Sequence, residues 1–471
     1  MLFNSLIFVF FVSAFFAFWP IVNRLPQNFR LAFILSASLF FYGWWSWQFI
    51  FLLLFTGLID FIGALAIRRF PSKRLFFLVA SLLANLGVLV FYKYALFFMR
   101  IWADVNGIST KELDELSANI FLPIGLSFYT FQSMSYTIDV YRNRMEPTKN
   151  PLLFFSFISF FPHLVAGPIV RAREILPQLS RVRFTTEVER FHGVKLIVIG
   201  FFKKTVIADN LAGFVNEAFN GKSFVTGNEY WWVAVLAFTF QIYFDFSGYS
   251  DIARGMAKCL GIHFRMNFNH PYGSVSFKDF WTKWHISLSY WFRDYVYIGL
   301  GGNKKGKLRG HVNMWITMIA SGFWHGANYT YLAWGGLHAF FLSLERVTKF
   351  DKWAKKHFLL KIIAILLVFL GCSMAWVFFR AKNLGQAVQI VDQLWSFNSH
   401  YAGGSSNLFK NAVLFLKIAI VAELLWVSGL RIRKHINPRF YLIMELIYLA
   451  ILINCCLFFR GPGEQFIYFQ F

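Results

Sequence analysis

Apolar stretches of about 20 residues or more recur along the whole chain, and each is long enough to cross the hydrocarbon core of a bilayer as a helix. Of the 471 residues, 57% are hydrophobic and only 15% are charged, whereas soluble domains average about 25% charged residues. The pattern predicts an all-α polytopic membrane protein and excludes a soluble enzyme with a single anchor. We expect one membrane domain over residues 1–471.

The charge is strongly positive, with 46 Lys and Arg against 23 Asp and Glu, which gives a net charge of +23. These basic residues fall in short loops between apolar segments, as expected for loops kept on the cytoplasmic side during insertion. Nucleic-acid binding is therefore not expected. The cysteines have no metal-ligand spacing, so no metal site is predicted. The apolar residues 1–20 lack a basic leader and a cleavage motif, and we expect them to be a retained span.

Loop charges predict a topology. The basic loop RRFPSKR at residues 68–74 is assigned to the cytoplasm, and the acidic stretch 103–117 to the outside. Residues 76–102 then cross outward. The same reasoning along the chain places both termini outside. The count is roughly eleven to thirteen spans or half-spans, depending on whether residues 29–67 form two helices broken near residues 42–47.

Two apolar segments are predicted to enter the membrane and return on the same side. Residues 151–170 have basic loops at both ends, and Pro162 and Pro168 prevent a straight helix. Residues 314–347 also lie between basic regions, which leaves two arms of about 15–17 residues each, slightly short of a full crossing. Their turn is expected at SGFWHGAN. The basic stretch 263–313 is predicted to be a structured segment on the cytoplasmic side.

Polar side chains inside apolar segments are costly in a membrane and mark candidate functional residues. We expect Asp245 and Asp251 to hydrogen-bond to Tyr, Trp or Arg and to hold neighbouring segments together. No glycine-rich phosphate loop occurs in the required context, so ATP and NAD are not indicated. The candidates for contacting substrate are Gln132, Gln241, Asp245, Ser247, Asp251, Trp324 and Asn328.

His325 lies between Gly322 and Gly326 at the predicted turn within the membrane. An imidazole can take a proton from a hydroxyl nucleophile and return it to a leaving group, so His325 suits a general base. The alternative is a core histidine hydrogen-bonded between helices. His285, in WHISLSYW, either orients an acyl donor or caps a helix. His338 is interpreted as a packing residue.

Several motifs occur in the order typical of one family. They include FFPHLVAGPIVRA at residues 160–172, FWHGANYTYLAWGGLH at 323–338, WVFFRA at 376–381 and FIYFQF at 466–471. Through these motifs the chain resembles the membrane-bound O-acyltransferase superfamily, and within it the bacterial branch of alginate O-acetylases. The resemblance implies a ring of tilted transmembrane and re-entrant helices around a central funnel, with catalytic roles for His325 and His285.

The resemblance further implies a membrane O-acetyltransferase with no bound cofactor. Its acyl donor would be acetyl-CoA, its partner a separate periplasmic acetyltransferase, and its final acceptor an exported or cell-wall polysaccharide, alginate-like or peptidoglycan. Two alternatives stay open. One is D-alanyl transfer to teichoic acid, with a carrier protein docking near residues 278–309. The other is a non-enzymatic acyl-group transporter, which would keep part of its flux without His325.

Overall fold

The computed structural model describes residues 1–471 apart from residues 2, 109–120, 166, 183, 222–226, 355, 397–406, 433–436 and 470–471. The described residues form helices and no strand, which confirms the predicted all-α class. Most of the predicted acidic outer stretch 103–117 and the last two residues of FIYFQF lie outside the described residues.

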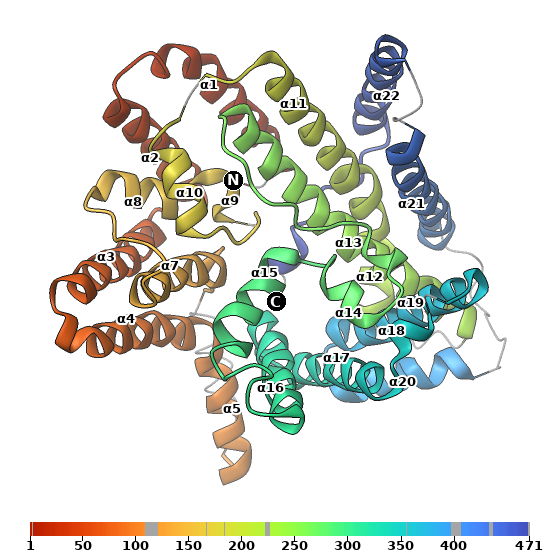
Figure 1. Cartoon of the computed structure of the whole chain (residues 1–471). Coiled ribbons are helices and arrows are strands. Elements are labelled where there is room, and N and C mark those ends of the chain that lie inside the picture. The colour runs from red at the N-terminus through yellow and green to blue at the C-terminus, as the bar shows by residue number, and fades with distance from the viewer. Residues whose placement is uncertain are drawn as a thin grey trace. The chain divides into compact units, whose positions relative to one another are not determined.

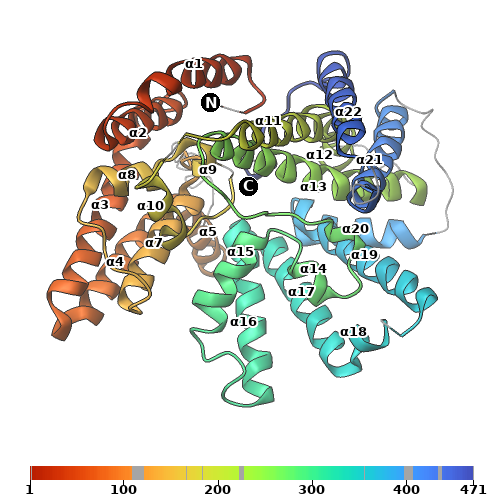
Figure 2. The same ribbon diagram turned by 45° about the horizontal axis from the view of Figure 1, so that its top comes forward.

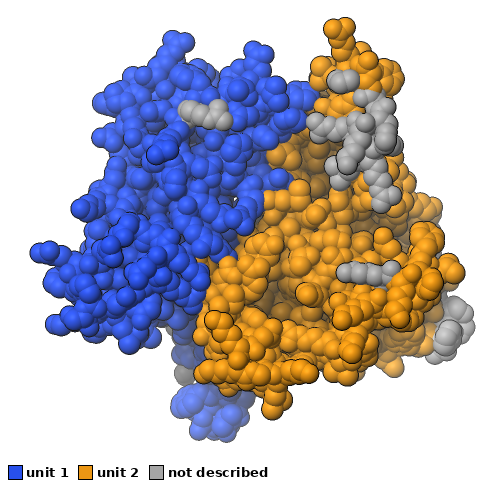
Figure 3. Space-filling view, viewed as in Figure 1, with its two compact units in different colours: residues 1–194, 253–265 blue, residues 195–252, 266–471 orange. Residues whose placement is uncertain are grey.

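The chain divides into two compact units, shown in different colours in Figure 3. Unit 1 comprises residues 1–194 and 253–265, and unit 2 comprises residues 195–252 and 266–471. Two long helices contribute to both units, α11 (Glu187–Phe201) and α13 (Asn228–Cys259). The helices of unit 1 are α1 (Leu6–Val22), α2 (Gln27–Gly43), α3 (Gln48–Arg69), α4 (Arg74–Leu89), α5 (Ala95–Asn106), α7 (Leu126–Tyr141), α8 (Pro151–Ile158), α9 (Phe161–Leu164) and α10 (Ala172–Leu179).

Besides its parts of α11 and α13, unit 2 carries ten α-helices among its described residues (Figures 1 and 2). They are α12 (Asp209–Asn220), α14 (Phe277–Trp281), α15 (Ile286–Trp291), α16 (Lys307–His325), α17 (Tyr329–Thr348), α18 (Phe350–Trp353), α19 (Phe358–Arg380), α20 (Leu384–Trp395), α21 (Asn407–Ile432) and α22 (Pro438–Phe458). Two π-helical segments also belong to unit 2, η3 (Phe202–Ala208) and η5 (Phe292–Tyr297).

Among the described residues, 4 helices are long and apolar enough to cross a membrane by length and composition. They cover Gln48–Arg69, Pro71–Asn106, Phe358–Arg380 and Arg439–Phe458. Their outward side chains are large and apolar, such as Phe51 on α3 and Phe358 on α19, which suits contact with lipid. The larger number of spans expected from the loop charges stays a prediction.

Two apolar segments are each divided into two helices. Helix α2 ends at Gly43 and α3 begins at Gln48, so of the two possibilities left open for residues 29–67 the structure has two helices, separated near residues 42–47. The segment 151–170 is broken into the short helices α8 and α9, and Pro162 lies in the first turn of α9. Proline is tolerated there because the first N–H groups of a helix have no partner within the helix.

The predicted in-and-out segment 314–347 is the hairpin of α16 and α17, and its turn at residues 326–328 falls within SGFWHGAN as predicted. The arms have 19 and 20 residues, which is longer than predicted because α16 begins at Lys307, inside the basic stretch. A Cβ on Gly322 would lie 2.2 Å from the Tyr331 carbonyl oxygen, so the glycine allows the two helices to approach closely.

A buried carboxyl joins three helices of unit 1. Asp60 lies in the middle of the apolar helix α3 and is 0% exposed. It accepts hydrogen bonds from Ser81 and Asn85 on α4, the latter at 2.9 Å, and from Thr137 on α7 at 2.7 Å. Helices α3, α4 and α7 lie side by side in both ribbon views (Figures 1 and 2). The sequence analysis did not single out this residue.

Replacing Asp60 with Ala is expected to destabilise the protein by roughly 2–4 kcal/mol, because three buried donors lose their acceptor. Asp60→Asn keeps an oxygen acceptor and should lose less. Thermal unfolding of the purified protein in detergent, followed by tryptophan fluorescence, measures both variants. An Asp60→Ala protein that unfolds at the wild-type temperature would contradict this account.

Candidate functional site

His325 is the last residue of α16 and lies at the tip of the α16–α17 hairpin, where only 3% of it is exposed. Its ring is surrounded by aromatic side chains from other parts of unit 2. The ring centroid lies 5.1 Å from Trp334, 5.2 Å from Phe379 and 5.5 Å from Tyr468. A histidine held in this way is largely shielded from water and has little freedom to change its orientation.

The glycines beside His325 serve packing within the protein. Gly322 closes the hairpin, and a Cβ on Gly326 would lie 2.1 Å from the Tyr331 ring. At both glycines the close neighbour belongs to the same hairpin, a backbone carbonyl at Gly322 and a tyrosine ring at Gly326.

His285 occupies the N-cap position of α15 with a φ of 39°, in the left-handed region. Its side chain does not cap the helix. Instead, its Nδ1 lies 3.2 Å from the Asn267 Oδ1, which also accepts a hydrogen bond from the Ser287 N–H at 3.1 Å. Because an amide oxygen only accepts, Nδ1 carries the proton and Nε2 carries the lone pair. The side chain of His285 therefore does not have the helix-capping role that was one of its two predicted roles. Its other predicted role, orienting an acyl donor, stays a prediction.

The two predicted histidines lie near the same two aromatic rings in unit 2. The ring of Tyr468 lies 5.5 Å from His325 and 6.4 Å from His285. The ring of Trp324 is also near both, 4.9 Å from His325 and 6.3 Å from His285. We call these four residues the histidine cage. It combines two imidazoles with a phenol in a buried, mostly aromatic setting.

Asp245 and Asp251, on α13, are buried and each forms an ion pair. Each carboxylate pairs with a lysine, a partner that the sequence did not predict, and hydrogen bonds to Tyr, Trp or Arg stay a prediction. Asp245 lies 2.8 Å from the Lys204 Nζ, and Asp251 lies 2.7 Å from the Lys203 Nζ.

The other predicted contact residues lie in several places. Gln241 and Ser247 are buried on α13, while Gln132 is buried on α7 in unit 1. Asn328 accepts a hydrogen bond from the Thr330 N–H at 3.0 Å and so caps α17. Substrate contact by these residues stays a prediction.

The sequence analysis missed two residues that contribute to the site. Lys204 lies in η3 and Tyr468 lies in the last described turn of the chain. Lys204 was detectable, because the pair Lys203 and Lys204 interrupts an apolar segment and charges within such segments are costly. Tyr468 was quoted only as part of a motif, and no spacing rule links it to His325.

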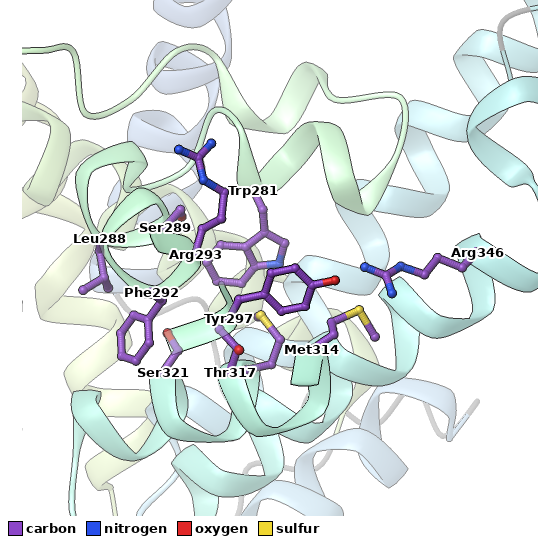
Figure 4. A pocket seen from close by; sticks show the side chains of 11 residues that line it. Trp281, Leu288, Ser289, Phe292, Arg293, Tyr297, Met314, Thr317, Ser321 and Arg346 are labelled. Atoms are coloured by element: carbon purple, nitrogen blue, oxygen red, sulfur yellow. The ribbon is translucent and has the colours of Figure 1, made fainter. Parts of the chain in front are cut away.

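A cavity of about 170 Å³ adjoins the hairpin in unit 2. Its lining includes Leu288 of α15, Phe292 of η5 and Ser321 of α16, one turn before His325. The guanidinium of Arg346 points toward Tyr297 (Figure 4). Apolar side chains and two arginines, Arg293 and Arg346, line the cavity, which suits a ligand with an apolar part and an anionic group.

Comparisons with known proteins define the family. Residues 147–379 match the membrane-bound O-acyltransferase family. A probable alginate O-acetylase of Pseudomonas aeruginosa is 39% identical over 411 residues, which are 85% of this chain and 76% of that protein. A peptidoglycan O-acetyltransferase of Helicobacter pylori is 36% identical over 434 residues, 84% of this chain and 80% of that protein.

A more distant relative carries a different acyl group in its name. A teichoic acid D-alanyltransferase of Bacillus subtilis is 29% identical over 274 residues, 56% of this chain and 67% of that protein. Together these matches show that the chain belongs to the membrane-bound O-acyltransferase family. It is a multi-pass membrane O-acyltransferase.

The stability of the protein should depend on His285 in acid. Burial lowers the pKa of His285 to about 3, whereas a histidine in the unfolded chain has a pKa of about 6.5. The unfolded state therefore binds more protons than the folded state between these values, and the contribution of His285 to stability falls as the pH falls through this window. At about pH 5 the loss is about 2 kcal/mol.

The test compares the unfolding temperatures of wild type and His285→Gln in detergent at neutral pH and at about pH 5. The variant should lose less stability on acidification than the wild type. Equal losses would contradict the buried neutral imidazole.

Proposed function

We propose that this O-acyltransferase takes acetyl groups from cytoplasmic acetyl-CoA and transfers them toward the outer side of the membrane for O-acetylation of a polysaccharide. The observation that carries the proposal is the histidine cage, in which His325 and His285 both lie near the rings of Trp324 and Tyr468. The printed names of the relatives, alginate O-acetylase and peptidoglycan O-acetyltransferase, support an exported or cell-wall glycan as the final acceptor.

The chemistry assigned to His325 is general base catalysis. An acceptor hydroxyl attacks the thioester carbonyl carbon, the C–S bond breaks, and an ester and a free thiol form. His325 takes the hydroxyl proton during attack and returns it to the departing thiolate, so the imidazole ends neutral. The surrounding rings keep water away, which favours transfer to the acceptor over hydrolysis.

His285 is assigned a supporting role at the donor. As a neutral imidazole whose Nδ1–H is directed to Asn267, it presents a fixed ring orientation. The adjacent cavity is assigned to the donor arm, because its walls are apolar and Arg346 can bind a phosphate oxygen. Ser321 connects this cavity to His325 along one turn of α16.

The cellular setting is proposed from the loop charges. A bacterial inner membrane with both termini outside keeps the basic loops in the cytoplasm. The donor would then meet the site from the inside and the acceptor from the outside. A separate periplasmic acetyltransferase is the partner expected to pass the acetyl group to the polysaccharide.

A second candidate function is D-alanyl transfer to teichoic acid, favoured by the similarity to the Bacillus subtilis D-alanyltransferase. It would use the same histidine cage with a carrier protein in place of acetyl-CoA. The higher identity and coverage of the O-acetylases favour acetyl transfer. The family match argues against the third possibility, a non-enzymatic acyl-group transporter.

Replacing His325 with Ala is expected to lower polysaccharide O-acetylation at least a hundredfold, because the proposed proton transfer loses its base. The test complements a deletion strain with each variant and measures ester-linked acetate in the isolated glycans. His338→Phe is the matched control, since His338 is also buried in the hairpin and its ring stacks on Phe280 at 6.0 Å.

The control should keep most of the acetylation at a comparable protein level in the membrane. Persistence of acetylation in His325→Ala would overturn the proposed mechanism. Loss of D-alanyl esters in place of acetyl esters would favour the second candidate.

A further inference from the structure

A buried lysine connects the centre of unit 2 to the segment that follows α22. The Lys204 Nζ lies 2.8 Å from a carboxylate oxygen of Asp209 and 2.8 Å from one of Asp245. It also donates a hydrogen bond of 3.0 Å to the carbonyl oxygen of Glu464. The Lys204 side chain is 1% exposed. One ammonium group therefore joins η3, α12 and α13 to the backbone of the C-terminal segment.

The same cluster reaches the histidine cage. The second carboxylate oxygen of Asp245 accepts a hydrogen bond of 2.8 Å from the Ile467 N–H. The next residue is Tyr468, whose ring lies 5.5 Å from His325 and 6.4 Å from His285. A path of direct contacts thus runs from Lys204 through Asp245 and Ile467 to the cage.

A glycine completes the attachment of this segment. The Gly461 N–H donates to the Thr205 carbonyl oxygen at 2.8 Å. A Cβ on Gly461 would lie 2.8 Å from the Asn210 backbone nitrogen and 2.8 Å from the Asp209 Cβ. A side chain at this position would push the segment away from the start of α12. Residues 461–467 are therefore held at Gly461, Glu464 and Ile467.

Stability alone does not account for such a cluster. Burying an ammonium with carboxylates costs desolvation free energy, and well-packed apolar residues often stabilise a protein as much. What a buried ion pair with hydrogen bonds provides is a defined geometry, since each donor and acceptor has a narrow range of directions. Here the bonded cluster fixes the backbone at Ile467, the residue before Tyr468, whose ring lies beside His325.

We propose that Lys204 is a positioning residue for acyl transfer. It holds residues 461–467 so that the Tyr468 ring lies against His325 and keeps the imidazole in its working orientation. This inference rests on the proposed function of His325. It assigns no proton or acyl group to Lys204, which acts through Asp245 and the backbone.

The neighbouring lysine offers a matched control. Lys203 is also in η3, forms a buried ion pair with Asp251 at 2.7 Å and lies 4.9 Å from the centre of the Trp426 ring. Lys203→Met removes the ammonium that pairs with one buried carboxylate, Asp251, and Lys204→Met removes the one that pairs with two, Asp209 and Asp245. Only the second removes the lysine that bonds Glu464 and Asp245.

The experiment measures consumption of radiolabelled acetyl-CoA by membranes that hold equal amounts of each folded full-length variant. We expect Lys204→Met to lower kcat by at least tenfold, with KM for acetyl-CoA within threefold of wild type. Lys203→Met should lower kcat by less than threefold. Equal losses in the two variants would overturn the proposal, because they would reflect the loss of an ion pair in general.

A double-mutant cycle tests the path to the cage. Tyr468→Ala should lower kcat about as much as Lys204→Met, and the double variant should be no slower than Tyr468→Ala alone. If the two single-variant losses in kcat multiplied in the double variant, Lys204 and Tyr468 would act independently, which would contradict a shared path. The outcome is separable from the proposed function, since a fully active His325→Ala overturns the mechanism whatever Lys204 does.

If Lys204→Met does not fold, Gly461→Ala decides the question, because it displaces the same segment and leaves the buried charges intact. We expect Gly461→Ala to lower kcat by at least threefold, again with little change in KM. A wild-type rate in Gly461→Ala would overturn the proposal.

Discussion

Polar groups in a membrane-spanning fold must find their partners within the protein, because the surrounding hydrocarbon offers none. The buried ammonium of Lys204 is one polar group that meets this constraint with partners from several elements. Its charge is balanced by Asp209 and Asp245, and these contacts join η3, α12, α13 and the C-terminal segment. In unit 1, Asp60 meets the same constraint with three neutral donors and joins α3, α4 and α7.

The histidine cage depends on close packing as well as on polar pairing. Helices α16 and α17 approach closely at Gly322, and this places His325 at the tip of a tight hairpin. Asn267 sets the orientation of His285. The rings of Trp324 and Tyr468 lie near both imidazoles, and both histidines are buried. In the proposed mechanism, preorganisation of this kind places His325 without a cost at the moment of reaction.

The sequence predicted much of the fold, and for physical reasons. Apolar length and loop charge are local properties, so the all-α membrane class, the break between α2 and α3 and the α16–α17 turn follow from short stretches of the chain. The motif histidines His325 and His285 were also predicted, and their proximity in unit 2 is consistent with a shared site.

The contacts that the sequence did not reveal connect residues far apart in the chain. The partners of Asp245 are 41 residues upstream, at Lys204, and 222 residues downstream, at Ile467. Hydrophobic periodicity carries no signal for such pairs. The same holds for Tyr468, whose place beside His325 depends on how the C-terminal segment folds back. The lengths of the hairpin arms were underestimated. The predicted start of the first arm, residue 314, was set by where the basic charges end, whereas α16 begins at Lys307.

The central claim is that His325 catalyses transfer of an acyl group from a donor on the inner side of the membrane to an acceptor on the outer side. Sealed membrane vesicles of known orientation test it most directly, because acetyl-CoA does not cross a bilayer. Inverted vesicles that contain the chain should release free thiol from added acetyl-CoA, and right-side-out vesicles should do so only after permeabilisation. Inverted vesicles with His325→Ala should release none. Equal release from both orientations, or from the variant, would contradict the account.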